Sequence, residues 1–577
     1  MKLAKIDLQN SMYQSGSGIP ETVELSQNNT INGDTFHNAF FEGYWNQYTS
    51  VNEISLTISF QGEIDLQVFR RDLRTKREEL VTSQSLKNQE LKSRSISLKV
   101  AEKSESRIFF RIKALTDTVF DNRTCYWSTS NPPQRSISLA VIMCTFNKQK
   151  YILKNLNRLL EEINNRNDVS IFVIDNASNL NLDIPRVNYV PQGNFGGAGG
   201  FTRGLIEAKK NKEITNFLFM DDDIDLDPDM IFRTIGWLSF QIDDNPVAGA
   251  MLNIQKRNSI WEQGALFATE SEMLSPTPVT FDLSLDKKES LDKISEQKEI
   301  DYGGWWYFSF SREHVEKVGL PLPFFIRGDD KEFGVRLKKF GHNTLPLPGI
   351  GVWHEPFTTK TSSWLLYYDL RNSLIIHMLY KWDKSAQLRI IKELTKNFIS
   401  DLLVFKYNNA NNTLLSIKKA MKGPTLLRKE STPSGHKEIF NSLDPFKNGS
   451  FTEETNEFQR PIKSRLATFI KFLTWNGHLL PSALMKTSVQ YGNYQRFKTE
   501  ILTSQPLLPA KQIVYFDKNH QKTFKYNISY LAFAKLLSLY SIVILKFWVT
   551  SPILAWRWRK SNKLLTSEEF WESYLKS

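Results

Sequence analysis

The most restrictive feature of this sequence is a series of apolar segments, starting at residue 137, that alternate with helix-like segments. "ISLAVIMCTFN", "VSIFVIDNAS" and "ITNFLFM" are continuous apolar runs, as in strands buried on both faces of a parallel sheet. Helical periodicity fills "KQKYILKNLNRLLEEINNR" and "FTRGLIEAKKN" between them. This alternation predicts an open, doubly wound α/β sheet, in which ligands bind beyond the carboxyl ends of the strands.

The third of these strands ends in a cluster of carboxylates. Six aspartates lie between residues 221 and 229, in "DDDIDLDPD". Adjacent carboxylates repel one another and lose hydration on burial unless a cation lies among them. Because alternate residues of an extended chain point the same way, Asp221 and Asp223 can reach one cation and a diphosphate. A solvated acidic turn is the alternative, whereas an EF-hand is excluded because its required glycine and glutamate are missing from either starting point.

The second strand end and a glycine-rich loop belong to the same edge of the expected sheet. Asp175 follows the second strand, where it could hold a base or a ribose. The loop "GNFGGAGGFTRG" (193–204) matches neither the dinucleotide-binding pattern nor the P-loop pattern. Its backbone could approach a ligand closely, with helix N–H groups directed at negative charge, or it could simply form a tight turn.

Three later motifs carry residue types suited to catalysis or to sugar binding. "PFFIRGDDKEFGVR" places Asp329 and Asp330 at the start of an amphipathic helix, either as an acidic N-cap or as a general base. "GVWHEPF" places His354 between an apolar segment and a proline, as a structural residue or as a ligand. "GGWWYFSF" contains Trp305 and Trp306, either a platform on which a sugar stacks or part of a core.

The regions on either side follow other patterns. Residues 1–135 contain segments such as "EISLTISFQGEIDLQVFRRD", in which apolar and polar residues alternate, so we expect an antiparallel β-sandwich there. We expect the α/β domain to cover residues 136–382 and a mainly helical region to cover residues 383–577. The polar segment 268–300 is expected to form a surface loop.

Charge and apolar content bear on where the protein acts. The net charge is +12, but the basic residues are dispersed and match no nucleic-acid-binding motif. Two cysteines, and a start without the apolar core of a signal peptide, predict a reducing compartment. The most apolar stretch (531–560) is interrupted by Lys535 and Lys546, so we expect it to lie in a membrane interface without spanning it. A helix that packs in an oligomer or in the body of the protein is the alternative.

In combination, these motifs resemble those of family 2 glycosyltransferases of the GT-A fold, and more closely the bacterial galactofuranosyltransferases that use UDP-galactofuranose. The resemblance rests on "NFGGAGGF", "MDDDI", "WWYF", "PFFIRGDDKEFGVR" and "GVWHEPF", in this order over residues 135–360. It extends into the N-terminal region through "HNAFFEGYWNQYTSV". It implies a Rossmann-like catalytic domain between a β-sandwich and a helical region. It also implies an inverting, metal-dependent transfer of galactofuranose to a lipid-linked glycan at the cytoplasmic face of the membrane.

The same resemblance assigns roles to individual residues. It implies a Mn²⁺ or Mg²⁺ site at Asp221, Asp223 and His354. It implies a general base at Asp330, with Asp329 beside it. The residues implied to bind the nucleotide sugar are Lys148, Asp175, Asn194, Gly197, Asp221 and Asp222, and those on the acceptor side are Trp305, Trp306 and Glu262. Lys148 stands where the family more often has arginine.

Two other functions remain open at the level of the sequence. A family 2 transferase could use another donor, such as UDP-glucose, UDP-galactopyranose or dTDP-rhamnose. A non-catalytic glycan-binding protein would use the N-terminal β-sandwich instead, although it would not need the carboxylate and histidine motifs. The sequence also leaves open whether the protein is a homo-oligomer.

Overall fold

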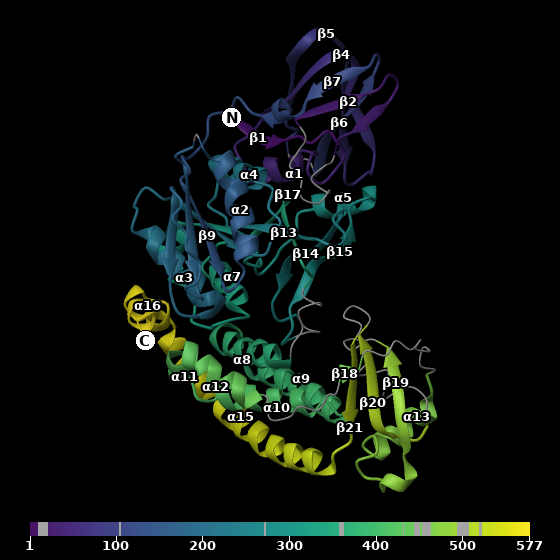
Figure 1. Cartoon of the computed structure of the whole chain (residues 1–577), viewed down its shortest axis with the longest axis vertical. Helices are drawn as coiled ribbons and strands as arrows, with labels where there is room; N and C mark the ends of the chain where they lie inside the picture. Colours follow the sequence, from purple (N-terminus) through teal and green to yellow (C-terminus); the bar gives the residue numbers. More distant parts are fainter. Residues whose placement is uncertain are drawn as a thin grey trace. The chain divides into compact units, whose positions relative to one another are not determined.

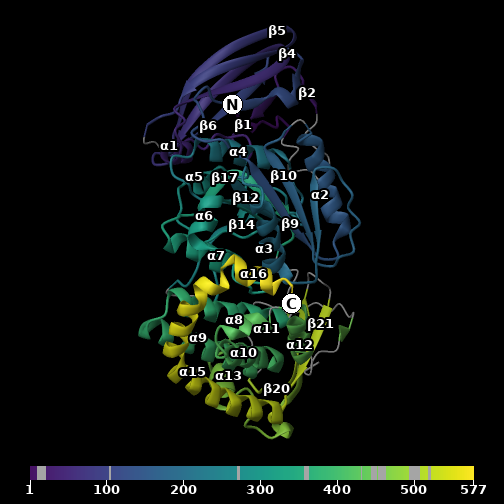
Figure 2. The same ribbon diagram turned by 90° about the vertical axis from the view of Figure 1, so that its left-hand side faces the viewer.

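A computed structural model describes most of the chain, in two compact units whose elements are labelled in Figures 1 and 2. The described residues are 1–9, 21–102, 105–164, 166–269, 273–356, 363–430, 432–443, 451–452, 463–492, 507–517 and 522–576. Unit 1 consists of Met1–Phe267, Pro276–Leu322 and Asp330–Pro356, and unit 2 of Ala268–Ser275, Pro323–Asp329 and Phe357–Ser577. The N-terminal β region and the α/β region therefore share one unit.

The N-terminal part of unit 1 is an antiparallel sheet of eight strands, as the alternating pattern predicts. Its elements are β1 (Lys2–Lys5), β2 (Thr22–Leu25), β3 (Thr30–Asn32), α1 (Glu42–Tyr48), β4 (Glu53–Asp72), β5 (Glu78–Lys99), β6 (Ser106–Ala114), β7 (Thr118–Asp121) and β8 (Tyr126–Ser128). The long strand β4 pairs with β5 along one edge and with β8, β7 and β6 along the other, so all eight strands belong to one connected sheet. Ile54, Leu56 and Ile58 on β4 are fully buried, which is the core face that the period of two predicts.

The second part of unit 1 is a nine-stranded mixed sheet with helices between its strands, which confirms the expected α/β fold. Its strands are β9 (Leu139–Thr145), β10 (Val169–Asp175), β11 (Val187–Pro191), β12 (Asn216–Asp221), β13 (Val247–Asn253), β14 (Ser259–Leu266), β15 (Thr277–Ser284), β16 (Tyr307–Ser311) and β17 (Leu345–His354). Its helices are α2 (Gln149–Glu162), α3 (Gly196–Lys209), α4 (Asp229–Phe240), α5 (Lys288–Ser295), α6 (Arg312–Val318) and α7 (Asp329–Lys339).

The direction of the strands within this sheet reverses next to β12. The order is β11-β10-β9-β12-β16-β13-β14-β15, and β17 pairs with β13. Strands β11, β10, β9 and β12 are parallel to one another, while β16 runs antiparallel to β12 and to β13. The parallel half therefore brings the ends of β9, β10 and β12 to one edge, where open α/β sheets bind ligands.

The polar segment 268–300 is not the surface loop that its composition predicts, because it contains β15 and α5. Strand β15 pairs with β14 and extends the sheet. Helix α5 carries Asp292, whose side chain is 5% exposed and lies against the N-terminal sheet. The error has a physical reason: the partners of Asp292 lie about two hundred residues earlier in the chain, so local composition could not reveal them.

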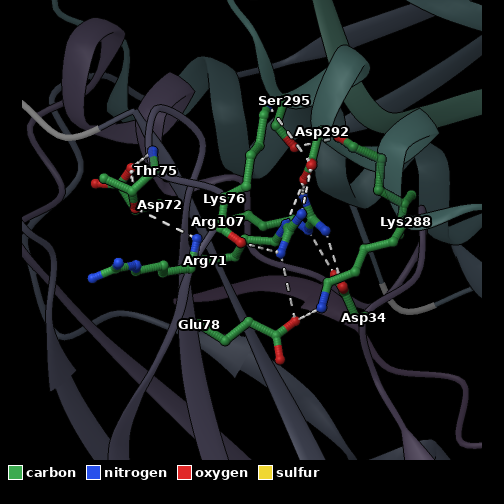
Figure 3. Close-up of polar contacts among 12 residues, drawn as sticks. Asp34, Arg71, Asp72, Thr75, Lys76, Glu78, Arg107, Lys288, Asp292 and Ser295 are labelled. Carbon is green, nitrogen blue, oxygen red and sulfur yellow. Dashed lines mark hydrogen bonds and ion pairs between the residues drawn. The ribbon is translucent and has the colours of Figure 1, made fainter.

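Asp292 is the centre of a buried ion-pair network within unit 1 (Figure 3). Arg71 donates two hydrogen bonds to its carboxylate, at 2.6 and 2.7 Å, and Arg107 donates a third at 2.6 Å. Arg107 also forms a bidentate pair with Asp34, at 2.6 and 2.9 Å. Lys288 of α5 pairs with Glu78 at the edge of the same network. These contacts fasten α5, and with it the β14–β15 side of the sheet, to the N-terminal sheet.

Replacing Asp292 by asparagine should destabilise the protein by about 3 kcal/mol, because removal of one partner of a buried ion pair leaves the other charges uncompensated. The side chains of Arg71 and Arg107 are only 8% and 0% exposed, so solvent cannot replace the lost carboxylate. Urea unfolding followed by tryptophan fluorescence measures the effect. The exposed pair Arg74–Glu105 supplies a control, since Glu105→Gln should change stability by less than about 0.5 kcal/mol. Equal effects of the two variants would contradict the role of the network.

The same carboxylate makes stability depend on pH in the acidic range. Burial alone would raise the pKa of Asp292, but the hydrogen bonds and charges of Arg71 and Arg107 outweigh burial and lower the pKa from 3.8 to about 2. A depressed folded-state pKa stabilises the protein above the unfolded-state pKa, and this contribution is lost as the pH falls toward 2. The stability difference between the wild type and Asp292→Asn should therefore shrink over that range. Unfolding curves at pH 6, 4 and 2.5, conditions chosen to bracket about two pKa units, test this.

Unit 2 contains the helices that the C-terminal periodicity predicts and a four-stranded sheet that it does not predict. The helices are α8 (Ser363–Tyr380), α9 (Lys384–Leu403), α10 (Tyr407–Ala420), α11 (Thr425–Glu430), α12 (Pro433–Leu443), α13 (Arg465–Leu473), α15 (Tyr530–Leu565) and α16 (Glu568–Tyr574). The strands are β18 (Phe451–Thr452), β19 (Lys486–Gly492), β20 (Ala510–Asp517) and β21 (Lys522–Asn527), in the order β18-β21-β20-β19. The tendency of a segment to form a strand depends on its neighbours in the sheet, so the local sequence signal for these strands is weak. Helix α8, which we expected in the catalytic domain, belongs to unit 2.

Candidate functional site

Three strand ends meet at the expected edge of the sheet. Strands β9 and β10 pair so that Thr145 lies beside Asp175, and β9 and β12 pair so that Cys144 lies beside Asp221. The last residues of β9, β10 and β12 are therefore neighbours in space, although they lie up to 76 positions apart in sequence. This alignment places the aspartate cluster where the α/β topology predicts a ligand.

A short β-bridge brings His354 to the aspartates. Asp225 and Trp353 pair through two backbone hydrogen bonds, of 2.7 and 3.3 Å, which place the end of β17 beside the chain that follows β12. As a result, one side-chain atom of each of Asp221, Asp223 and His354 lies within 4.8 Å of the others. The His354 Nε2 atom is 3.1 Å from Asp223 Oδ1 and 3.8 Å from Asp221 Oδ2. These three residues could hold a divalent metal ion.

The hydrogen bonding of His354 suits a metal ligand. Its Nδ1 atom lies 2.7 Å from the backbone carbonyl oxygen of Glu355, which can only accept a hydrogen bond. Nδ1 therefore carries a proton, and Nε2 is the ring nitrogen that faces the two aspartates and that a metal ion could take as a ligand. The imidazole is 2% exposed, so this orientation is fixed by packing. Two carboxylates and one imidazole form a mixed oxygen and nitrogen donor set, which suits a divalent transition-metal ion better than the all-oxygen preference of Ca²⁺.

Lys148 and Asp222 complete the charges at this edge. The ammonium of Lys148 donates to Asp223 Oδ2 at 2.5 Å and lies 3.7 Å from Asp222 Oδ1. Burial alone would lower the pKa of Lys148, but the charges of Asp222 and Asp223 outweigh burial and raise it. Burial raises the pKa of Asp222 to about 6, although the nearby Lys148 and a hydrogen bond from Thr145, at 2.6 Å, oppose the rise. Lys148 thus lies among the aspartates, where its charge offsets their mutual repulsion.

Several residues that sequence reasoning missed hold the aspartate segment in place. Asn155 of α2 donates to the backbone carbonyls of Asp222, at 3.2 Å, and of Ile224, at 2.9 Å. Asp225 accepts hydrogen bonds from three cationic side chains, those of Lys154, Arg158 and Arg257. A polar Asn155 beside the apolar residue Leu156, on the buried side of α2, was the available sequence signal. The converging cations gave no such signal, because Arg257 joins them only through the fold.

The glycine-rich loop packs against the sheet more than its sequence suggested. A Cβ atom on Gly200 would overlap Sγ of Cys144 on β9, and one on Gly204 would overlap the side chain of Ile142. Gly196 adopts φ of 70°, which allows the sharp entry into α3, and Asn194 Oδ1 accepts a hydrogen bond from its N–H at 3.0 Å. Close packing of helix on sheet therefore explains two of the glycines, while Gly197 is half-buried at the first turn of α3.

Asp175 lies at the expected strand end, but its carboxylate is already occupied. It is fully buried and accepts hydrogen bonds from the backbone N–H groups of Ala177, Asn179 and Leu180 and from the hydroxyl of Tyr189, at 2.8 to 3.0 Å. This geometry favours a role in shaping the loop after β10 over direct contact with a base or a ribose. The neighbouring Asn176 ties that loop to the glycine-rich segment by donating to the carbonyl of Gly196 at 2.9 Å.

The tandem tryptophans do not form an exposed stacking platform. Trp305 is 5% exposed and packs edge-to-face against Phe201, Phe219 and Phe333. Trp306 is 4% exposed and donates from Nε1 to the carbonyl of Gly249 at 3.0 Å. The structure therefore places both rings in the core, which was the alternative to a sugar-binding role, because strand β16 directly after them lies in the middle of the sheet.

The remaining candidates are more accessible. Glu262 is half-buried on β14, opposite Met251 of β13. Asp329 and Asp330 begin α7; Asp329 is 9% exposed, whereas Asp330 is half-buried and accepts a hydrogen bond from the backbone N–H of Lys331 at 2.7 Å. Of the two adjacent carboxylates, Asp330 is the one that a substrate can reach more easily.

Comparisons of sequence assign both parts of unit 1 to known families. Residues 140–319 match the profile "Glycosyl transferase family 2". Residues 8–129 match the profile "Galactofuranosyltransferase 2 N-terminal". The chain is also 26% identical over 427 residues to galactofuranosyltransferase GlfT2 of Mycobacterium tuberculosis, covering 70% of this chain and 67% of the relative. It is 27% identical over 429 residues to GlfT2 of Mycolicibacterium smegmatis, covering 70% of this chain and 66% of that relative.

Solved structures of other proteins also resemble this chain at low identity. One is the mannosyltransferase PcManGT of Pyrobaculum calidifontis in complex with GDP-Man and Mn²⁺, with 12% identity, a TM-score of 0.29, and coverage of 55% of this chain and 83% of that one. Another is TarS of S. aureus, residues 1–349, in complex with UDP-GlcNAc, with 13% identity, a TM-score of 0.32, and coverage of 56% and 98%.

The identity of the chain follows from the profiles and the curated relatives together with the sheet. The family 2 profile covers most of the nine-stranded sheet with the aspartate edge, and the N-terminal profile covers most of the antiparallel sheet before it. Both domains occur in one chain, in the order expected from the family that the sequence motifs resemble. The chain is therefore a glycosyltransferase that contains a family 2 domain after a galactofuranosyltransferase N-terminal domain, and it is similar to the galactofuranosyltransferases.

Proposed function

We propose that this enzyme transfers galactofuranose from UDP-galactofuranose to a hydroxyl group of a glycan acceptor, with inversion at the anomeric carbon. The observation that carries the proposal is the convergence of Asp221, Asp223 and His354 at the carboxyl edge of the sheet. A group of this composition holds a divalent cation, Mn²⁺ or Mg²⁺, beside the diphosphate of a nucleotide sugar. When bound, the cation offsets the negative charge that develops on the leaving diphosphate.

Lys148 supplies a second positive charge to the same leaving group. Its ammonium lies within 4 Å of both Asp222 and Asp223, at the end of β9 and therefore at the edge where the donor binds. The side chain is 38% exposed, so the ammonium can turn from the carboxylates toward phosphate oxygens. Asn194 lies two residues before α3 and accepts a hydrogen bond from the N–H of Gly196, and Gly197 lies in the first turn of this helix, whose N-terminus favours negative charge.

Asp330 acts as the general base in this proposal. It accepts the proton of the acceptor hydroxyl while the hydroxyl oxygen attacks the anomeric carbon, and the bond from that carbon to the diphosphate oxygen breaks on the opposite face. One displacement of this kind inverts the configuration. Its half-buried position supports this role better than the buried position of Asp329, and Glu262 is left as the candidate acceptor contact on β14.

A panel of nucleotide sugars tests the proposed function directly. Purified protein is incubated with UDP-galactofuranose, UDP-glucose, UDP-galactopyranose or dTDP-rhamnose and a short galactofuranoside acceptor, with Mn²⁺, with Mg²⁺ or with EDTA. We expect product only from UDP-galactofuranose, and none with EDTA. Product from another donor would replace the donor assignment while keeping the enzyme class. Binding of the glycan without turnover of any donor would favour the glycan-binding alternative.

We further propose that the acceptor is lipid-linked and that α15 docks the enzyme on the anionic cytoplasmic face of a membrane. Among the described residues, α15 is the one helix that is long and apolar enough to cross a bilayer, with 36 residues and an 18-residue stretch of mean hydropathy 1.7. One of its faces packs within unit 2 on α8, α9 and α10, where Phe547 and Trp558 are fully buried. A helix held along one side by its own unit is suited to lie in the interface.

The opposite face of α15 has the composition of an interfacial surface. Its exposed apolar side chains recur at helical spacing and are 51 to 69% exposed: Ile542, Leu545, Trp548, Val549, Ile553 and Trp556. Exposed Lys546, Arg557 and Lys560 lie among them, and the Lys560 ammonium lies over the Trp556 ring at 5.2 Å. Basic residues of this kind contribute about 1 kcal/mol each near an anionic leaflet. The charge of this face therefore complements anionic lipid.

Two substitutions on this face should release the enzyme from vesicles. The double variant Val549→Asp/Ile553→Asp removes two side chains that are 69% and 65% exposed, and should lower the fraction bound to anionic vesicles at least about tenfold. Ile242→Asp, at a residue of unit 1 that is 58% exposed, is the matched control and should bind normally. Point variants are preferable to removal of residues 531–577, because that deletion would take away the buried Trp558 and Trp571. Normal flotation of the double variant, or a change only in oligomeric state, would overturn the membrane proposal.

A further inference from the structure

The segment that leads into α7 has an unusual backbone conformation. Phe325 and Arg327 have φ of 71° and 66°, and Gly328 has φ of 79°. The left-handed region costs roughly 1–2 kcal/mol for residues with a side chain, and persists only where the surroundings enforce it. Two non-glycine residues with positive φ within three positions therefore need contacts that stabilise this conformation. The next residues along the chain are Asp329 and Asp330.

Two adjacent residues of α8 hold this backbone through its carbonyl groups. Arg371 donates from Nη2 to the carbonyl of Phe324 at 2.8 Å. Asn372 donates from Nδ2 to the carbonyls of Ile326, at 3.1 Å, and of Arg327, at 2.5 Å. Arg371 also donates from Nε to Oδ1 of Asn372 at 2.8 Å, which turns the amide so that its N–H₂ group faces the loop. Three carbonyl groups within four residues of the strained segment are thus bonded to two adjacent residues of α8.

The holding side chains are themselves rigid. Arg371 and Asn372 are both fully buried, and the Arg371 guanidinium lies 4.8 Å from the centre of the Tyr368 ring. Phe325, which is 3% exposed, stacks on His436 at 4.2 Å between ring centres. The Tyr368 hydroxyl lies 2.9 Å from Nδ1 of His436 and closes the cluster. Neither the donors nor the ring of Phe325 can move without disturbing this packing.

We propose that Arg371 and Asn372 are positioning residues, which hold residues 324–327 in the strained conformation that directs the Asp330 carboxylate. The inference rests on the proposed role of Asp330 as general base. The bonded carbonyls lie only three to six residues before Asp330, and the intervening Gly328 and Asp329 leave little slack in the chain. A misplacement of about 1 Å at a catalytic group can cost on the order of 10²-fold in rate. We call the hydrogen bonds from Arg371 and Asn372 to the carbonyls of residues 324–327 the clamp. The clamp affects turnover, whereas donor binding at Asp221 and Asp223 does not depend on it.

The first test removes the amide of Asn372. Asn372→Ala should lower kcat by about 10- to 100-fold, while KM for the donor and Kd for UDP change by less than about twofold. The matched control is Gln387→Leu, which removes another buried amide of unit 2 that donates to a carbonyl, that of Trp548, at 2.6 Å. If both variants lose similar thermal stability and only Asn372→Ala loses turnover, positioning is supported. Unchanged kcat in folded Asn372→Ala would overturn the inference.

The second test asks whether the strain itself is what Asn372 holds. Glycine adopts positive φ without a steric penalty, so Arg327→Gly removes part of the need for the clamp. The loss of kcat caused by Asn372→Ala should therefore be several-fold smaller when measured in Arg327→Gly than in the wild type. An equal loss in both backgrounds would show that Asn372 does not act through the conformation of Arg327. Neither outcome depends on the stability effect of Arg327→Gly, because each loss of kcat is measured between two proteins that have the same residue at position 327.

The two proposals fail in different ways. If Asp330→Asn keeps the wild-type kcat, the base has been misassigned and the proposed function needs revision, whatever the clamp variants do. If Asp330→Asn is inactive and Asn372→Ala is fully active, the role of Asp330 stands and the clamp inference alone is wrong.

Discussion

Asp330→Asn should fold and bind donor normally, yet lose about 10²- to 10⁴-fold in kcat. Asparagine has nearly the same shape as aspartate, so the change removes only the ability to accept a proton, and loss of a general base typically costs this much. The half-buried position of Asp330 at the start of α7 allows an acceptor hydroxyl to reach it. Calorimetry with UDP should give an unchanged Kd, because no contact of the aspartate edge is altered.

Asp329→Asn is the informative comparison for that variant. Asp329 is 9% exposed and lies next to Asp330 in the sequence, so its substitution removes one negative charge at the same helix start. We expect its kcat to fall much less than that of Asp330→Asn. A reversed order of the two effects would transfer the role of base to Asp329, and undiminished turnover in both would exclude the pair.

His354→Ala and Asp223→Ala should each lower metal-dependent turnover by about 10³-fold or more. A cation that neutralises a leaving diphosphate supplies several kcal/mol to the transition state, and each variant removes one of three donors of the group. Rates are measured against Mn²⁺ concentration, and Mn²⁺ binding is measured separately by calorimetry. Weaker Mn²⁺ binding should accompany the loss of rate in both variants.

A histidine outside the group provides the control for this experiment. His342 is half-buried in unit 1 and contacts His314, at 4.4 Å between ring centres. His342→Ala should leave the dependence of the rate on Mn²⁺ unchanged, even if it lowers stability. Wild-type rates for His354→Ala at limiting Mn²⁺ would show that the three residues do not hold the catalytic cation.

The sequence by itself determined the class of fold and the region of the site. Continuous apolar runs alternating with amphipathic helices predict parallel strands with covered faces, and unit 1 contains them as β11, β10, β9 and β12 of its mixed sheet. The rule that ligands bind beyond the carboxyl ends of strands then selected Asp175, Asp221 and Asp223 before any contact was known. These features depend on local periodicity and on chain order, both of which are visible in the sequence.

Only the tertiary structure decided the state of individual side chains. The sequence of Trp305 and Trp306 is equally compatible with a sugar-stacking platform and with a core. The contacts of Trp305 with Phe201 and of Trp306 with Gly249 show that both rings lie in the core. Asp175 lay at the expected strand end, but four local donors occupy its carboxylate. Burial and saturation of this kind depend on which residues surround a side chain, and sequence order does not give that.

The same reason explains the long-range parts of the site. His354 reaches Asp223 across 131 positions because Asp225 and Trp353 form a β-bridge, and the clamp on residues 324–327 comes from a helix about 45 positions later. A periodic pattern indicates which faces of a segment are exposed to solvent and which are buried, averaged over a few turns. It does not record which distant segment lies beside it, since that is fixed only when strands pair and helices pack in three dimensions.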